Sequence, residues 1–107
     1  MTINDLKYVV GEVKTGDIAT IRFSGKVTEE STAQFNREFE FLENVICPRL
    51  IRVLINSEGG SVLYGMSTYS TIQNSTVETE CVIEGMAASM ASIIWAAGTR
   101  SLMRDYS

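Results

Sequence analysis

Histidine is absent from all 107 residues of the sequence. The triad of a serine protease uses a histidine as its general base, so no Ser-His-Asp triad is complete within this sequence. Zinc sites also draw on histidine and cysteine, and the two cysteines, Cys47 and Cys81, lack the close spacing of a ligand pair. We therefore expect no metal and no cofactor. Both thiols should be reduced and part-buried structural side chains rather than partners in a disulfide.

Long apolar runs and an excess of positive charge are missing as well. The longest apolar stretch, residues 93–97, falls far short of the roughly 18 residues of a membrane span. The formal net charge is -4, whereas nucleic-acid binding requires a basic patch. The first residues do not combine a basic segment with an apolar one, as a signal peptide would. These absences predict a cytoplasmic protein that binds neither membranes nor nucleic acid.

The patterns that are present alternate between strand and helix. A short strand is expected at residues 8–10, and residues 18–23 alternate in polarity as a strand does. Thr28 is a suitable N-cap for a helix. The only proline, Pro48, is expected to end that helix. The apolar face of the helix is formed by side chains at helical spacing, namely Phe35, Phe39 and Leu42.

The second half of the sequence continues this alternation. Residues 50–55 form a nearly continuous apolar run, which favours a parallel strand covered on both faces. After a glycine-rich loop, we expect a helix at 62–73, a strand at 77–83, a helix at 89–97 with a glycine cap, and a strand from 101. Such alternation predicts βαβ units with right-handed crossovers and a mainly parallel sheet. The fold class is therefore α/β, in a single domain.

One glycine-rich segment, residues 56–62, directly follows an apolar strand and reads N-S-E-G-G-S-V. Glycine can adopt a positive φ, and its lack of a side chain lets the backbone come close to a ligand. Gly59 and Gly60 therefore indicate a loop that binds a ligand. A tight turn between a strand and a helix would explain them equally well.

A second segment, residues 85–92, reads G-M-A-A-S-M-A-S and places Ser89 where a strand gives way to a helix. A serine in this position can cap the helix, bind an anion together with nearby amides, or act as a nucleophile. The methionines on either side, Met86 and Met90, can fill the core or line a substrate pocket. Loop or cap roles explain the other nearby serines, which are Ser57, Ser61 and Ser92.

Together, the two segments resemble the proteolytic subunit family of the Clp proteases. That family carries I-N-S-P-G-G-S/V-V and G-x-A-A-S-M-G/A-S at the same separation. Here the matching residues are 55–62 and 85–92. The resemblance extends over residues 18–107, and further matches occur at Phe41-Leu42-Glu43, Gly65-Met66, Tyr69 and Ala97-Gly98.

This resemblance implies a crotonase-like (ClpP-like) spiral of βαβ units and an endopeptidase that forms an acyl-enzyme. Ser89 would be the nucleophile, and the backbone amides of Gly60 and Met90 would form the oxyanion hole. An extended substrate peptide would lie along Gly59, Gly60, Ser61, Val62 and Leu63, close to Met86. The resemblance also implies a homo-oligomeric ring, heptameric and possibly stacked, that receives unfolded proteins from an AAA+ ATPase.

The sequence also departs from the family pattern. The family's histidine would lie a few residues beyond Ser107, and its acidic residue and ring-bridging helix would lie further on. We therefore expect these 107 residues to correspond to the N-terminal half of a protomer and to be inactive alone. Unless further residues cover them, the exposed sheet surfaces should make the half-domain self-associate or dissolve poorly.

Three residues would belong to the ATPase-docking pocket, namely Phe41, Arg52 and Leu54. The family has aromatic rings at the last two positions, and a charge disfavours an apolar docking loop, so the ATPase partner is left open. Glu58 replaces the family's proline. Residues 97–103 form a shorter segment than in housekeeping members. In this respect the sequence resembles the Clp-like proteases of phages and prophages, some of which process capsid proteins. Both a housekeeping-like and a phage-like protein are compatible with the sequence.

Two other functions are compatible with the same segments. A crotonase-type acyl-CoA enzyme would use paired amides to hold a thioester enolate. Ser89 argues against it, because that chemistry usually places an acid near the reacting carbon. A non-catalytic ring component would explain the missing histidine directly.

Overall fold

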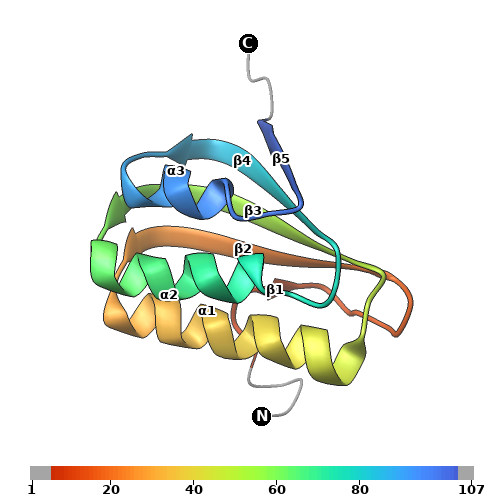
Figure 1. Ribbon diagram of the computed structural model, residues 1–107. Helices are drawn as coiled ribbons and strands as arrows, with labels where there is room; N and C mark the ends of the chain where they lie inside the picture. Colours follow the sequence, from red (N-terminus) through yellow and green to blue (C-terminus); the bar gives the residue numbers. More distant parts are fainter. Residues whose placement is uncertain (1–5, 104–107) are drawn as a thin grey trace.

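A sheet of five strands, in the order β1-β2-β3-β4-β5, organises the computed structural model, which describes residues 6–103. The strands are β1 (Val9–Val10), β2 (Ile18–Val27), β3 (Leu50–Gly60), β4 (Thr79–Ala87) and β5 (Arg100–Met103) (Figure 1). β2 to β5 are parallel neighbours, and β1 pairs with β2 in the antiparallel sense. The predicted α/β class and mainly parallel sheet are therefore confirmed.

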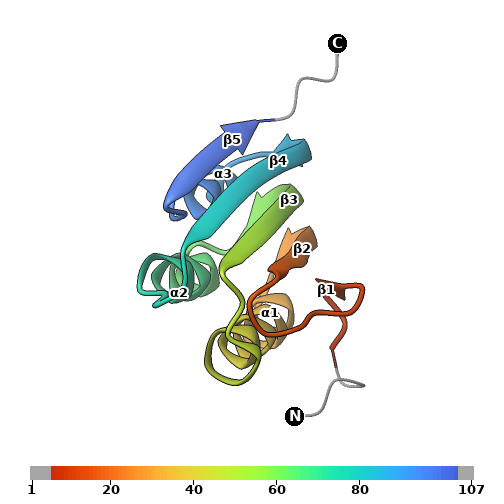
Figure 2. The ribbon, with the colours of Figure 1, turned by 90° about the vertical axis from the view of Figure 1, so that its right-hand side faces the viewer.

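The helices lie on one face of this sheet. They are α1 (Glu29–Phe41), α2 (Val62–Gln73) and α3 (Met90–Trp95), and a π-helical turn, η2 (Leu42–Ile46), continues α1. Figure 2 shows the three α-helices on the same side of the strands. Each βαβ unit adds its strand on the same side of the preceding one, so the chain advances as a spiral. This arrangement is consistent with the predicted ClpP-like fold.

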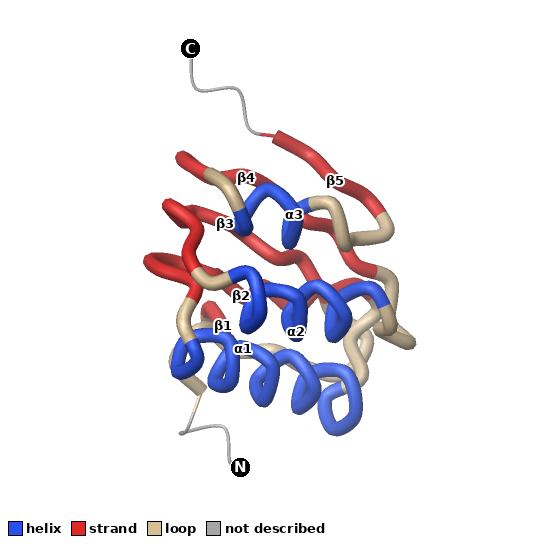
Figure 3. Tube along the Cα trace, turned by 60° about the vertical axis from the view of Figure 1, so that its left-hand side comes forward, coloured by secondary structure: helices blue, strands red, loops and turns tan. Residues whose placement is uncertain are grey.

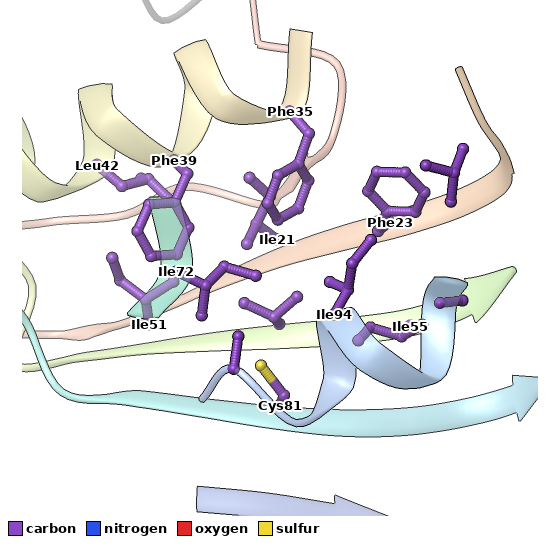
Figure 4. Packing of buried hydrophobic residues seen from close by; sticks show 14 of the residues in the cluster. Ile21, Phe23, Phe35, Phe39, Leu42, Ile51, Ile55, Ile72, Cys81 and Ile94 are labelled. Atoms are coloured by element: carbon purple, nitrogen blue, oxygen red, sulfur yellow. The ribbon is translucent and has the colours of Figure 1, made fainter. Parts of the chain in front are cut away.

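The hydrophobic core fills the space between the helices and the sheet (Figure 4). Phe35 and Phe39 of α1 are fully buried, as their helical spacing predicted. The ring of Phe35 packs edge-on against Phe23 of β2, with 5.3 Å between the ring centroids. Cys81 of β4 is also fully buried, and burial raises the pKa of its thiol to about 12.

Helix α1 begins as predicted but ends differently. Thr28 is its N-cap and forms a reciprocal capping box with Ser31. At the other end, the helix passes into η2, which stops at Cys47 in the left-handed conformation, with φ of 54°. The chain has therefore left the helix before Pro48. Cys47 is exposed there, so the expectation that it is part-buried is wrong.

The second face of the sheet carries ion pairs in place of helices. Within the described residues, the helices pack on one face only, so the expectation that residues 50–55 are covered on both faces is wrong. Arg52 pairs with Glu80 at 3.1 Å, and Arg22 reaches Glu84 at the same distance. The exposed fraction of Leu54, which lies between these pairs on β3, is only 5%. Side chains of neighbouring strands thus shield an apolar residue that no helix covers.

Several element boundaries also differ from expectation. Residues 56–60 belong to β3, because they continue to pair with β2 up to Val27↔Gly60, so they do not form a loop. β4 begins at Thr79 and continues to Ala87. α3 is shorter than expected and has its C-cap at Ala96 rather than at a glycine.

Within residues 6–103, no helix is both long and apolar enough to cross a membrane. The expectations about a signal peptide and about the chain beyond β5 fall on residues 1–5 and 104–107, outside the described residues.

Candidate active site

The two glycine-rich segments meet at one edge of the sheet, where β3 and β4 end. Because the two strands are parallel, their carboxyl ends lie side by side, and the register pairs Ser57 with Ala87. In Figure 3, the chain leaves both strands at this edge and turns back into α2 and α3. This edge of a parallel α/β sheet is where ligands generally bind.

Ser89 occupies a strained turn between β4 and α3. Its φ of 52° and ψ of -121° place a non-glycine residue in a region that costs about 1–3 kcal/mol. The residue stands at the N-cap position of α3, but its side chain makes no capping hydrogen bond. Helix capping, the simplest explanation of this serine, is therefore excluded. Ser89 is instead exposed on a sharp turn from strand to helix, as nucleophilic serines of hydrolases are.

The other serines of the two segments have structural partners. The hydroxyl of Ser61 caps α2 by accepting a hydrogen bond from the Tyr64 amide at 3.3 Å. Ser92 donates to the Ser89 carbonyl at 2.7 Å. Ser57 is buried and bonded to the backbone on both sides. Within the described residues, the Ser89 hydroxyl alone among these four makes no hydrogen bond.

Gly59 and Gly60 allow β3 to reach the Ser89 turn. Both have positive φ, at 92° and 150°. A Cβ atom on Gly59 would lie 2.5 Å from the Ala88 carbonyl oxygen and 3.0 Å from the Ser89 Cβ. At Gly60, a Cβ would collide with the backbone of Val27. The predicted positive φ is confirmed at both glycines, and the close neighbour that the structure shows at Gly59 is the backbone of the candidate nucleophile turn.

The two methionines beside Ser89 have different environments. The side chain of Met90 is 1% exposed and packs against Gly65 of α2, so it belongs to the core. Its backbone amide lies at the first position of α3, where no partner within the helix exists. Met86 is half-exposed at the end of β4. Of the two methionines, only Met86 has an exposed side chain.

Exposed apolar side chains surround this edge of the sheet. Val62 and Leu63 open α2 and are 63% and 76% exposed. The sequence predicted them as contacts for substrate, together with Ser61, which is engaged in capping. Two further apolar residues on the neighbouring helices are half-exposed, namely Met66 of α2 and Ile93 of α3, and the sequence reasoning did not predict them as contacts. The helical spacing of Val62 and Met66, which are four residues apart and share one face of α2, could have indicated Met66.

The three residues assigned to ATPase docking do not gather within one chain. Phe41 lies half-buried at the end of α1, on the helical side of the sheet. Arg52 and Leu54 alternate with the core residues of β3 and so point to the opposite face. Arg52 is held by Glu80, and Leu54 is buried.

The strained turn at Ser89 lies beside the glycines that end β3, and a sharp turn from strand to helix that carries a serine is typical of hydrolases. Comparison with known proteins agrees with this class. The family model for Clp protease matches residues 14–104, and the chain belongs to that family.

The curated relatives are proteolytic subunits of ATP-dependent Clp protease. The subunit of Cyanophora paradoxa is 41% identical over 81 residues, which cover 76% of this chain and 42% of that protein. The subunit of Ligilactobacillus salivarius is 35% identical over 75% of this chain and 41% of its own length. That of Bacteroides fragilis is 36% identical, with coverage of 75% and 39%. The chain thus spans about two fifths of the length of these relatives.

Proposed function

We propose that the native protein is a Clp-type serine endopeptidase subunit with Ser89 as its nucleophile. The observation that carries this proposal is the strained, uncapped and exposed turn at Ser89, closely approached by Gly59. Backbone strain of this size persists only where the surrounding structure enforces it, and it concentrates at active sites.

In this mechanism, the Ser89 oxygen attacks the carbonyl carbon of a substrate peptide bond. The amides of Gly60 and Met90 donate hydrogen bonds to the oxygen that becomes negatively charged. The carbon–nitrogen bond then breaks, the amine leaves with a proton, and an acyl-enzyme remains on Ser89. A water molecule hydrolyses this ester and restores the free hydroxyl.

The substrate would bind as an extended strand along Gly60, Ser61, Val62 and Leu63. Its backbone would pair with this segment, as in other cases of strand addition to a sheet edge. The half-exposed Met86 would contact a substrate side chain. Unfolded polypeptides suit this mode, because only an extended backbone offers its amides and carbonyls for pairing.

The general base must come from outside these 107 residues, because they contain no histidine. The 107 residues alone should therefore be inactive. As the resemblance implies, the native subunits would form a ring, and an AAA+ ATPase would supply substrate. A non-catalytic ring component is the second candidate.

Labelling with a fluorophosphonate separates these two functions. The protein encoded by the native gene is incubated with the reagent, and its intact mass and tryptic peptides are measured. A single adduct on Ser89, lost in Ser89→Ala and kept in Ser75→Ala, would support the protease. Absence of any adduct on the native protein would refute it and favour a non-catalytic ring component.

A further inference from the structure

The sheet changes register on both sides of β3 just before the candidate active site. Between β2 and β3, the pairing moves from Ser24↔Asn56 to Lys26↔Gly59, which leaves one extra residue on β3. Between β3 and β4, it moves from Ile55↔Ile83 to Ser57↔Ala87, which leaves two extra residues on β4. Such bulges interrupt the backbone ladder and re-aim the residues that follow them. Here the residues that follow are the Gly59-Gly60 pair and the Ser89 turn.

The side chain of Ser57 bridges the first of these irregularities. Its hydroxyl donates to the carbonyl of Gly25 on β2 and accepts a hydrogen bond from the Gly59 amide at 3.1 Å. The exposed fraction of Ser57 is only 2%. Its backbone carbonyl accepts from the amide of Ala88 at 3.0 Å, directly before the nucleophile turn. One residue thus connects β2, the glycine pair and the segment that carries Ser89.

The side chain of Asn56 bridges the second irregularity. Its Oδ1 accepts a hydrogen bond from the Met86 amide at 3.1 Å, within the extra residues of β4. Gly85, with φ of 101°, packs directly on the Asn56 amide group, and a Cβ there would lie 2.9 Å from Oδ1. Asn56 therefore takes the place of the main-chain partner in the interrupted ladder.

We propose that Asn56 and Ser57 are positioning residues that hold the amides of the oxyanion hole at a fixed distance from the Ser89 hydroxyl. This inference rests on the proposed function. Gly60 is the last residue of β3, and Ser89 lies in the turn that follows β4. The ladder between β3 and β4 is interrupted just before these two residues, where the distance between them must be set. The two adjacent side chains span that interruption. A displacement of about 1 Å between reacting groups can reduce the rate roughly 100-fold.

The decisive variant is Ser57→Ala in the protein encoded by the native gene, and Ser75→Ala is its matched control. The Ser75 hydroxyl also donates to one backbone carbonyl and accepts from one amide, both of Val77, but it lies in the loop before β4. Each variant removes one hydrogen bond to a backbone carbonyl and one from a backbone amide. Only Ser57→Ala removes a bridge to the candidate active site.

Hydrolysis of a fluorogenic peptide measures the effect. We expect kcat to fall about 10- to 100-fold in Ser57→Ala, with KM changed by less than about threefold, whereas Ser75→Ala keeps both within about twofold. Asn56→Ala, which alters an exposed side chain and should fold, is expected to lower kcat in the same way. An unchanged kcat in Ser57→Ala and Asn56→Ala, or an equal loss in Ser75→Ala, would overturn the proposal.

A second readout does not depend on activity. Amide hydrogen exchange should accelerate at Gly59 in Ser57→Ala, because its acceptor is lost, and also at Ala88, because the bridge loosens. Faster exchange at Gly59 alone would mean that the contact is local, which overturns the positioning role. If Ser89→Ala retains full hydrolysis, the proposed function fails. The exchange rate of the Ala88 amide in Ser57→Ala still decides, independently of activity, whether Ser57 holds β3 and β4 together.

Discussion

Replacement of Gly59 by alanine would test whether the close approach of β3 to the Ser89 turn is essential to the fold. The added Cβ would meet two penalties. The φ of 92° is unfavourable for any residue with a side chain, and the atom would lie 2.5 Å from the Ala88 carbonyl oxygen. Gly16 offers a matched control, because its φ is 85° and nothing lies within 4 Å of a Cβ there.

The two penalties differ in size. The left-handed backbone costs about 1–2 kcal/mol for an alanine, and this is the whole effect expected of Gly16→Ala. The collision at Gly59 involves backbone on both sides, so it can be relieved only by moving β3 or the turn. Such overpacking typically costs a further 1–3 kcal/mol. Gly59→Ala should therefore lose about 2–5 kcal/mol of unfolding free energy.

Urea denaturation followed by tryptophan fluorescence measures both variants. The only tryptophan, Trp95, lies at the end of α3 and donates its indole N–H to the Leu102 carbonyl at 2.7 Å, so it reports on the element that carries Ser89. The Gly59→Ala midpoint should fall clearly below that of Gly16→Ala. Equal losses in the two variants would refute the argument from close approach.

Three further predictions concern the N-terminal strand and the two thiols. Glu38 is fully buried and accepts hydrogen bonds from the amides of Tyr8 and Val9 at 2.7 and 3.1 Å. Glu38→Ala should therefore lower the free energy of unfolding by about 2–4 kcal/mol and expose β1 to limited proteolysis. Cleavage at the wild-type rate would contradict this anchoring of β1. A disulfide-exchange reagent at pH 8 should modify the exposed Cys47 rapidly and Cys81 only after unfolding, and comparable rates would contradict the structure. Because burial raises the pKa of Cys81 to about 12, its contribution to stability should be complete below about pH 8.5 and be lost progressively as the pH rises towards 12.

Much of the architecture could be predicted from local patterns. Thr28 with its acidic neighbours marked the start of α1, because side-chain capping depends only on residues within one turn. Phe35 and Phe39 gave the buried face of that helix through their spacing. The alternation of strands and helices gave the parallel sheet, since parallel neighbours require a crossover between them.

Residues 56–60 were predicted as a loop because glycine is common in turns. In the structure they extend β3, since the backbone of β2 beside them supplies partners up to Val27. Positive φ at Gly59 and Gly60 is therefore used inside a strand, where it accommodates a bulge and a close neighbour. A pattern of residue types cannot distinguish these two uses, because the neighbour is distant in the sequence.

Ser89 also shows what the sequence leaves open and what the structure decides. The sequence left capping, anion binding and nucleophilic attack open, because all three favour a serine at the start of a helix. The structure excludes capping, since the Ser89 side chain makes no capping hydrogen bond. It also assigns Met90 to the core and Met86 to the surface, although the two residues are similar in sequence context.

By itself, the sequence determined the order of the elements, the buried face of α1, the absence of a histidine and the family, because each of these depends on residue identity and short-range spacing. The tertiary structure alone decided that β3 reaches the Ser89 turn, that Asn56 and Ser57 bridge two breaks in the ladder, and that one face of the sheet carries ion pairs. These features depend on which strands become neighbours and in what register. Register is set by packing across the whole sheet, so no local stretch of sequence contains it.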